Sequence, residues 1–252
     1  MFEWLGLTEY DLNNIALRIT LRLSSGQVRN FETYINQVRS TLVSETINTI
    51  YMVAYASLFA IIVGLAVGLV LYLTQPGGVH SMPRFNRVLG VIINIGRSIP
   101  FVVLIMLVFP LSRYIVGTSI GRTAAIVPLT ITAIPFMSRV VEAALNELGH
   151  GIIEAAISAG ATTRQLIFRV ILPESAPGLV SGFTLLIINL ITFSAMAGMV
   201  GGGGLGHVAN SFGLQRHRND FLVYTVIILV IMVQIIQFIG EFISKKLDKR
   251  NP

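Results

Sequence analysis

Residues 151–173 read GIIEAAISAGATTRQLIFRVILP, and this stretch decides how the rest of the chain is interpreted. It is a helix-compatible segment with polar side chains that lies between two strongly apolar blocks. In its first part, apolar residues recur at helical spacing and Glu154 and Ser158 fall on a different face. The apolar residues are Ile152, Ile153, Ala156 and Ile157. Gly160 is predicted to end this first helix.

A second helix is predicted to begin at Thr162, because Thr162 and Gln165 have the spacing of a capping box. It places Arg164, Gln165 and Arg169 on one side and apolar residues on the other, namely Leu166, Ile167, Val170 and Ile171. Pro173 is predicted to end it. Two short helices joined by a glycine bend at a membrane surface form a protrusion that a partner outside the membrane can bind.

The composition is that of a membrane protein. Of 252 residues, 54% are hydrophobic and 12% are charged, with a mean hydropathy of +0.76, whereas charged residues make up about a quarter of a soluble domain. The pI near 10.0 could suggest nucleic acid, but the basic residues are scattered over loops without interleaved aromatics, which favours contact with anionic lipid. The absence of cysteine excludes disulfides and Cys-based metal or redox sites.

Five apolar segments are long enough to cross a hydrocarbon core of about 30 Å, and they predict an all-α integral membrane protein. They are 50–73, 88–110, 123–145, 178–200 and 221–243. Residues 1–45 lack the uninterrupted apolar region of a signal peptide and are expected to form a surface or interfacial extension, with 30–45 helical. Residues 46–245 then form the transmembrane domain, and 246–252 form a basic tail.

Several residues within the segments are unusual for plain membrane spans. Every fourth residue of the first segment is small, which lets another helix approach closely, and packing within the same chain is the favoured interpretation: Ala56, Ala60, Gly64 and Gly68. Arg97 either lines the mouth of a pathway or extends its side chain to the membrane surface beside a kink at Pro100. Pro128 and Pro135 supply either bends for a moving helix or static kinks.

A small-residue stretch in the fourth segment could form a constriction. Met196 lies among small neighbours that include Ser194, and a flexible methionine can block a narrow path; plain core packing is the alternative. The glycine run that follows, 201–206, formally contains GxGxxG, but no strand precedes it and no acidic residue follows about twenty residues on. We predict a close-packed re-entry of the chain at the outer surface instead of a dinucleotide site.

Other patterns are absent from the sequence, and their absence narrows the function. There is no GxxxxGK[ST] motif, so the chain does not bind ATP as a P-loop protein does. The four histidines lack metal-ligand spacing. No carboxylate lies in the middle of a span, which argues against a carrier driven by protons or sodium ions.

The 151–173 stretch resembles the signature of ABC-importer permeases, in which an EAA triplet, a glycine and a final Leu-Pro have fixed spacings. Glu154-Ala155-Ala156, Gly160 and Leu172-Pro173 match it, and Val170 replaces an isoleucine. Four further stretches are similar to the methionine-uptake branch of this family: 97–101, 116–130, 173–180 and 194–206. The resemblance covers roughly 40–245.

The resemblance implies that residues 147–173 form a cytoplasmic coupling loop that docks in a groove of a separate ATPase subunit. The implied contact residues are Glu154, Ala155, Ala156, Gly160, Ala161, Thr162, Arg164, Leu172 and Pro173, and the pathway candidates are Met196, Ser194, Arg97 and Pro135. It further implies a homodimer, a cytoplasmic ATPase dimer that binds the ATP and Mg²⁺, and an extracytoplasmic substrate-binding protein. This chain would then be a non-catalytic subunit without a cofactor or metal of its own.

The implied substrate is methionine, with another polar amino acid or a small organic solute as the alternative. A stand-alone carrier or channel, and a membrane anchor for an enzyme, are further alternatives. The resemblance implies the bacterial cytoplasmic membrane with the N-terminus outside and the C-terminus inside. The charge bias is weak, with nine basic residues expected inside and eight outside, and the strongest local signal is KKLDKR at 245–250.

Overall fold

The computed structural model describes residues 25–248, apart from the side chains of 25–31 and of residue 150. All regular elements in that range are helices, as predicted. The chain divides into two units, Met1–Ser44 and Glu45–Pro252, and the account below concerns the second unit. Most of the predicted extension, 1–24, lies outside the described residues, whereas 30–45 is helical as predicted.

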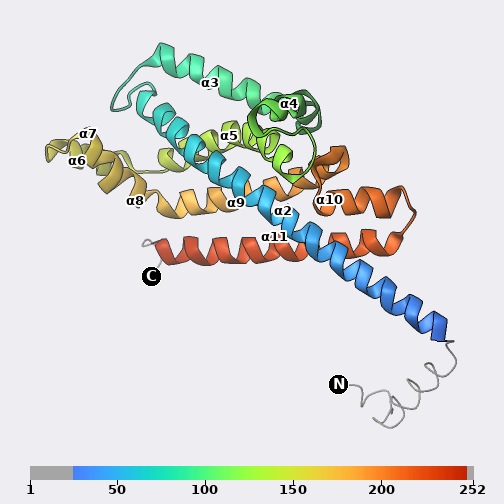
Figure 1. The fold of residues 1–252 in the computed structure, drawn as a ribbon. Coiled ribbons are helices and arrows are strands. Elements are labelled where there is room, and N and C mark those ends of the chain that lie inside the picture. The colour runs from blue at the N-terminus through green and yellow to red at the C-terminus, as the bar shows by residue number, and fades with distance from the viewer. Residues whose placement is uncertain (1–24, 249–252) are drawn as a thin grey trace, which may run out of the picture. The chain divides into compact units, whose positions relative to one another are not determined.

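The longer helices form the transmembrane part (Figure 1). They are α2 (Ser25–Thr74), α3 (Pro83–Ser98), α4 (Phe101–Val116), α5 (Arg122–Asn146), α9 (Ala176–Ala197) and α11 (Asn219–Leu247). Four of these, α2, α5, α9 and α11, are long and apolar enough to cross a membrane, and the bent pair α3–α4 makes a fifth candidate. Four of the five predicted spans therefore correspond to one long helix each.

The predicted second span, 88–110, corresponds to the bent pair, in which the chain turns by 100° between α3 and α4 at the Pro100 kink that the sequence offered as one alternative. Ile99 has extended backbone angles (φ −79°, ψ 122°) and Pro100 is the N-cap of α4. Proline has no N–H for a helical hydrogen bond and disfavours the helical conformation of the residue before it. Both effects end α3 at this point and start a new helix in another direction.

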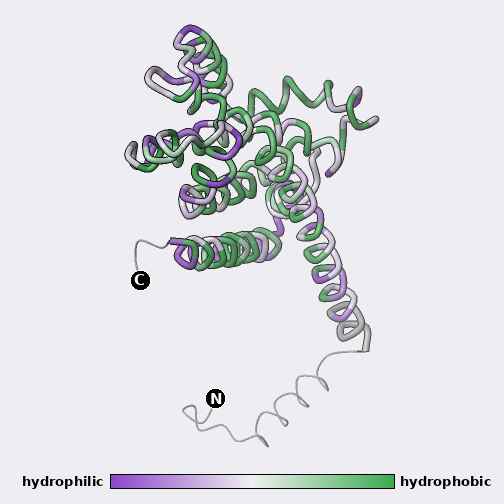
Figure 2. The backbone as a smooth tube through the Cα atoms, turned by 90° about the vertical axis from the view of Figure 1, so that its left-hand side faces the viewer, coloured by the Kyte–Doolittle hydropathy of each residue, from purple (hydrophilic) through white to green (hydrophobic). Residues whose placement is uncertain are grey.

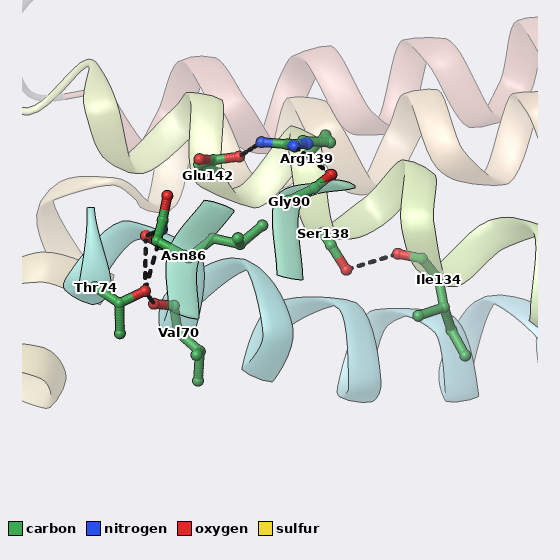
Figure 3. Close-up of polar contacts among 9 residues, drawn as sticks. Val70, Thr74, Asn86, Gly90, Ile134, Ser138, Arg139 and Glu142 are labelled. Carbon is green, nitrogen blue, oxygen red and sulfur yellow. Dashed lines mark hydrogen bonds and ion pairs between the residues drawn. The ribbon is translucent and has the colours of Figure 1, made fainter. Parts of the chain in front are cut away.

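Polar contacts hold α3 against α2 and α5 (Figure 3). The Asn86 amide donates to the Leu71 carbonyl at 2.7 Å, near the end of α2, and to Thr74 Oγ1 at 3.1 Å. Arg139 of α5 donates to the Gly90 carbonyl at 2.9 Å and forms an ion pair with Glu142 at 2.6 Å. These bonds to backbone carbonyls tie α3 to both neighbouring helices.

The row of small residues in α2 is buried within the same chain, as predicted, and its two glycines pack against α5. Ala56 and Ala60 are fully buried. A Cβ atom at Gly64 would lie 2.6 Å from Met137 Cβ, and one at Gly68 would lie 2.6 Å from the Ser138 carbonyl oxygen. Only glycine allows the two helices to approach this closely.

Helix α9 contacts α5, α11 and α4, and much of the core gathers around it. Leu186, Leu190 and Ile191 of α9 are buried in this core together with Leu129 and Met137 of α5. In contrast, only 6% of the residues in the most apolar stretch of α11 are buried within the chain. Figure 2 shows α11 as hydrophobic along most of its length and hydrophilic near its C-terminal end.

The glycine run turns the chain back after α9, as predicted. A π-helical turn, η3 (Gly198–Gly202), leads into the short helix α10 (Leu205–Val208) and then η4 (Ala209–Leu214). Gly201, Gly203 and Gly204 have φ of 98°, 76° and 77°, a backbone region that side chains with a Cβ disfavour.

Two polar side chains of α2 bind the end of this glycine run. The Gly204 N–H donates to Glu45 Oε2 at 2.6 Å, and the Leu205 N–H donates to Thr49 Oγ1 at 2.9 Å. Asn48, between them, accepts a hydrogen bond from Arg122 of α5 at 2.8 Å. These contacts join α2, α5 and α10 at the end of the unit away from α6–α8 (Figure 1).

Substitution of Gly68 by valine should destabilise the protein by about 1–3 kcal/mol, because the new side chain would overlap the Ser138 carbonyl and Val141. Thermal unfolding of the detergent-solubilised protein measures the effect. Ala66→Val is the matched control, since Ala66 lies in the same helix but is exposed. An equal melting temperature for the two variants would contradict the close packing of α2 on α5.

Thr49→Val keeps the shape of a side chain that is 1% exposed but leaves the Leu205 N–H without its acceptor. An unsatisfied buried N–H costs about 1–3 kcal/mol, so we expect a clear loss of thermal stability. Thr192→Val is the control, because Thr192 is exposed and its hydroxyl bonds only to the Ile188 carbonyl of its own helix. If both variants melt alike, the Thr49 contact does not stabilise the re-entry.

Candidate functional site

The coupling loop begins with helix α6 (His150–Ser158), which ends as the sequence predicts at Gly160. Gly160 has φ 79° and follows the C-cap residue Ala159. Its N–H bonds to the Ile157 carbonyl at 2.9 Å, and the Ala161 N–H bonds to the Ala156 carbonyl at 3.1 Å. This pair of bonds is a Schellman motif, which requires the left-handed conformation that glycine adopts without strain.

The predicted capping box at Thr162 is confirmed. Thr162 Oγ1 accepts from the Gln165 N–H at 3.3 Å, and the Gln165 side chain accepts from the Thr162 N–H at 2.8 Å. Helix α7 (Thr163–Gln165) starts there and passes directly into a π-helix, η2 (Leu166–Ile171). The turn between α6 and α7 is thus fixed by local hydrogen bonds on both sides.

The prediction that Pro173 ends the second helix is wrong. The chain stays helical through α8 (Leu172–Glu174), and α9 begins at Ala176. In η2 the Leu172 N–H bonds to the Ile167 carbonyl, five residues back, and this wider turn gives Pro173 the position of an initial helical residue, where no N–H is needed. Ser175 Oγ then donates to the Ile171 carbonyl at 2.7 Å.

The loop has one face in the bundle core and one face exposed. Ile153, Leu166 and Ile171 are buried in the same cluster as Leu145 and Leu148, which lie at and just beyond the end of α5. The exposed face carries several of the candidate contact residues, namely Glu154, Ala155, Gly160, Thr162, Arg164 and Pro173; Ala156, Ala161 and Leu172 are partly buried.

The predicted apolar face of α6 is only partly buried. Ile152 and Ile157 are 40% and 49% exposed, and Phe168 of η2 is 63% exposed. Apolar side chains that a chain leaves uncovered beside charged residues are typical of a protein-binding surface. Local spacing predicted these residues as helical but could not tell which of them the bundle covers.

Three contacts near the loop were not predicted from the sequence. His80 Nε2 lies 3.1 Å from Thr163 Oγ1, which places the 75–82 connection beside the loop. Ser244 of α11 donates to the Pro177 carbonyl at 2.9 Å and lies 2.9 Å from Ser181 Oγ. A cavity of about 260 Å³ lies between the end of α5, the start of α9 and the end of α11, and its lining includes Glu147 and Pro173.

These contacts show that the 75–82 connection, the coupling loop and the end of α11 share one end of the unit, as the predicted topology requires. Figure 1 shows α6–α8 at that end and α10 at the other.

The four pathway candidates do not form one cluster. Ser194 is 1% exposed and donates to the Ile191 carbonyl, whereas Met196 is 38% exposed. Pro135 lies against Gly96 of α3, where a Cβ would be 2.9 Å from Pro135 Cγ. Arg97 is exposed in the last turn of α3, immediately before the bend, as the alternative of a kink at Pro100 predicted.

Within residues 25–248, no group of three or more His, Cys, Asp or Glu side chains is placed to hold a metal ion. The exposed face of the loop is instead suited to binding another protein. It carries the Glu154 carboxylate, the side chains of Ile152 and Ile157 and the capped helix start at Thr162, on a segment whose other face is buried in the core.

Comparison with known proteins agrees with this geometry. The "Probable D-methionine transport system permease protein MetI" of Vibrio cholerae is 46% identical over 209 residues, which are 83% of this chain and 93% of that protein. The "Methionine import system permease protein MetP" of Bacillus subtilis is 42% identical over 221 residues, which are 87% of this chain and all of the relative.

Solved structures show the same fold. A chain of the MetNI methionine ABC transporter in an inward-facing conformation superposes with a TM-score of 0.82 at 42% identity, covering 83% of this chain and 97% of that one. A chain of an amino acid ABC transporter crystallised with histidines superposes with a TM-score of 0.69 at 18% identity, which shows a shared fold.

The match to a family model covers most of the membrane part and includes the coupling loop. Because residues 60–251 match the model described as "Binding-protein-dependent transport system inner membrane component", this chain belongs to that family of membrane permease subunits of ABC importers.

Proposed function

We propose that this chain is the permease subunit of an ATP-driven importer of methionine, of either the D or the L form. The single observation that supports this most is the 42–47% identity, over most of the chain, to permeases named for methionine or D-methionine transport. The TM-score of 0.82 to the MetNI chain supports the same proposal.

In this proposal two copies of the chain form the translocation pathway, each with its N-terminus outside and its C-terminus in the cytoplasm. A cytoplasmic ATPase dimer binds ATP and Mg²⁺, and an extracytoplasmic binding protein delivers the substrate. The exposed face of the coupling loop docks on the ATPase, with Glu154, Ala155 and Arg164 in contact and Ile157 and Phe168 filling an apolar groove.

The proposed coupling has a direct mechanical basis in the chain. The loop reaches α9 through η2, α8 and the hydrogen-bonded Ser175. It reaches α5 through a connection of three residues, 147–149, with Leu148 buried in the core. When the ATPase pair closes and moves the loop, α5 and α9 move with it, because close-packed cores transmit displacement.

The pathway itself would run along α9. Met196, which is exposed within the single chain, is the proposed constriction, with Ser194 behind it in the core and Arg97 and Pro135 at the bend between α3 and α4. Phe101 of α4 stacks on Phe193 of α9 at 4.5 Å, so the bent span contacts α9 three residues before the proposed constriction.

The coupling proposal predicts opposite results for two substitutions at Gly160. Gly160→Val forces a β-branched residue into φ 79° and should disrupt the Schellman turn, whereas asparagine tolerates that region. A Cβ at Gly160 meets no atom within 4 Å, so crowding does not distinguish the variants. We expect ATP-driven uptake into vesicles to fall at least about tenfold for valine, the equivalent of about 1.4 kcal/mol, and to stay near normal for asparagine.

Co-purification with the ATPase and the melting temperature control for folding in this experiment. Equal uptake by the valine and asparagine variants, with both complexes intact, would argue against a role for the turn geometry in coupling.

Uptake of radiolabelled amino acids by vesicles that contain this chain, its ATPase and its binding protein tests the substrate. We expect saturable, ATP-dependent uptake of methionine, with no uptake when the ATPase is omitted. Uptake of a different polar amino acid would support the importer function but refute methionine as its substrate. Flux from this chain alone would refute the importer and favour a stand-alone carrier.

A further inference from the structure

The turn between η4 and α11 carries an unusual arrangement of arginines on aromatic rings. The Arg216 guanidinium lies 4.5 Å from the centre of the Phe212 ring, and Phe212 stacks on Phe221 at 4.6 Å with 22° between the ring planes. On the other side, the Arg218 guanidinium lies 4.4 Å from the Phe221 ring. Two positive charges thus enclose a pair of stacked rings, and each is attracted to a ring face.

The backbone of this turn is also constrained. His217 has φ 53°, and it is the one residue other than glycine with positive φ in the described part of the chain. The Arg218 N–H donates to the Phe212 carbonyl at 3.0 Å. The left-handed residue and this hydrogen bond hold Arg216 and Arg218 on the two outer sides of the ring pair, while Phe221 is fully buried.

The charges at this end of the unit are not balanced. Of the eight carboxylates in 45–248, six lie in or beside the coupling loop or near the C-terminal ends of α5 and α11, whereas Glu45 binds the glycine run and Asp220 lies in the first turn of α11. Glu45 binds the Gly204 N–H, and Asp220 pairs with Arg218 at 3.1 Å. Arg216 and Arg113 have no ion pair within the described residues, and Arg122 bonds to the neutral amide of Asn48.

We propose that Arg216, held on Phe212 and reinforced by Arg218, is a docking point for carboxylates on the surface of the substrate-binding protein. The inference rests on the proposed function, which makes this end extracytoplasmic. A guanidinium held by a ring loses little conformational freedom when a carboxylate binds it, and its planar edge suits bidentate pairing. Arg113 and Arg122, which also have no ion pair within the described residues, add positive charge that attracts an acidic partner during the approach.

Lipid phosphate is the competing partner, and the observations favour protein. Arginine and lysine are enriched on the cytoplasmic side of membrane proteins, where anionic lipids attract them. Basic side chains at the opposite end do not follow that bias and need another partner. Arg216 also lies folded on the Phe212 ring of its own turn, and Phe212 in turn stacks on Phe221.

The test measures association of the fluorescently labelled cognate binding protein with the permease–ATPase complex in nanodiscs of zwitterionic lipid. We expect Arg216→Glu to slow association by about fivefold or more at low salt, with the difference largely lost at about 0.5 M salt, as for a steering charge. Arg216→Lys, which keeps the charge but not the planar group, should lie between native and glutamate. Arg87→Glu, an exposed charge reversal at the other end, should associate like the native complex.

Retention of the ATPase on purification checks that each variant folds. Association of Arg216→Glu at the native rate would overturn the docking inference, and so would an effect seen only when anionic lipid is added. If the native complex takes up substrate but the binding protein associates normally with the Arg216→Glu complex, only the docking inference fails and the proposed function stands. Native complexes that neither bind the binding protein nor take up substrate would refute the proposed function itself.

Discussion

Backbone N–H and C=O groups inside a hydrocarbon layer have no water to bind, so each must find a partner within the protein. This constraint accounts for the all-helical architecture and for what surrounds the interruptions of the helices. Near the end of α2, the Asn86 side chain donates a hydrogen bond to the Leu71 carbonyl. Where α8 passes into α9, the Ser175 hydroxyl donates to the Ile171 carbonyl. Where the glycine run ends, Glu45 and Thr49 accept its N–H groups.

Internal hydrogen bonds also order the loop between α5 and α9. Residues 147–173 are a chain of short helices with a Schellman turn, a capping box and a π-helical turn, and their inner side chains belong to the bundle core. Under the proposed function, a loop built in this way moves as part of α5 and α9 instead of bending by itself. The exposed isoleucines, Phe168 and Glu154 then remain available as contact surface for another subunit.

The two ends of the unit differ in chemistry as well as in shape. Carboxylates and basic groups are mixed near the coupling loop, whereas arginines outnumber acids near α10 and the turn before α11. At that second end three arginines lie on aromatic rings: Arg122 on Tyr51, Arg216 on Phe212 and Arg218 on Phe221. A family that works with a soluble binding protein on one side and an ATPase on the other needs two surfaces, and this asymmetry provides two chemically different ones.

Local chemistry made part of this structure predictable from the amino-acid sequence. The number of spans followed from the lengths of the apolar segments. The Gly160 bend and the Thr162 capping box followed from residues within a few positions of each other. The row of small residues in α2 predicted a close helix contact. The sequence by itself thus determined the membrane class, the form of the coupling loop and, through its motif, the family.

The tertiary structure decided what depends on distant partners or on competing local effects. Proline at 100 produces a 100° bend, whereas proline at 173 is accommodated in a continuing helix because a π-turn precedes it; the residue type is the same and the surrounding hydrogen bonds differ. Glu45 meets Gly204 across 159 positions, and Ser194 is buried while Met196 is exposed. These outcomes depend on which helices pack together, and local spacing contains no information about that.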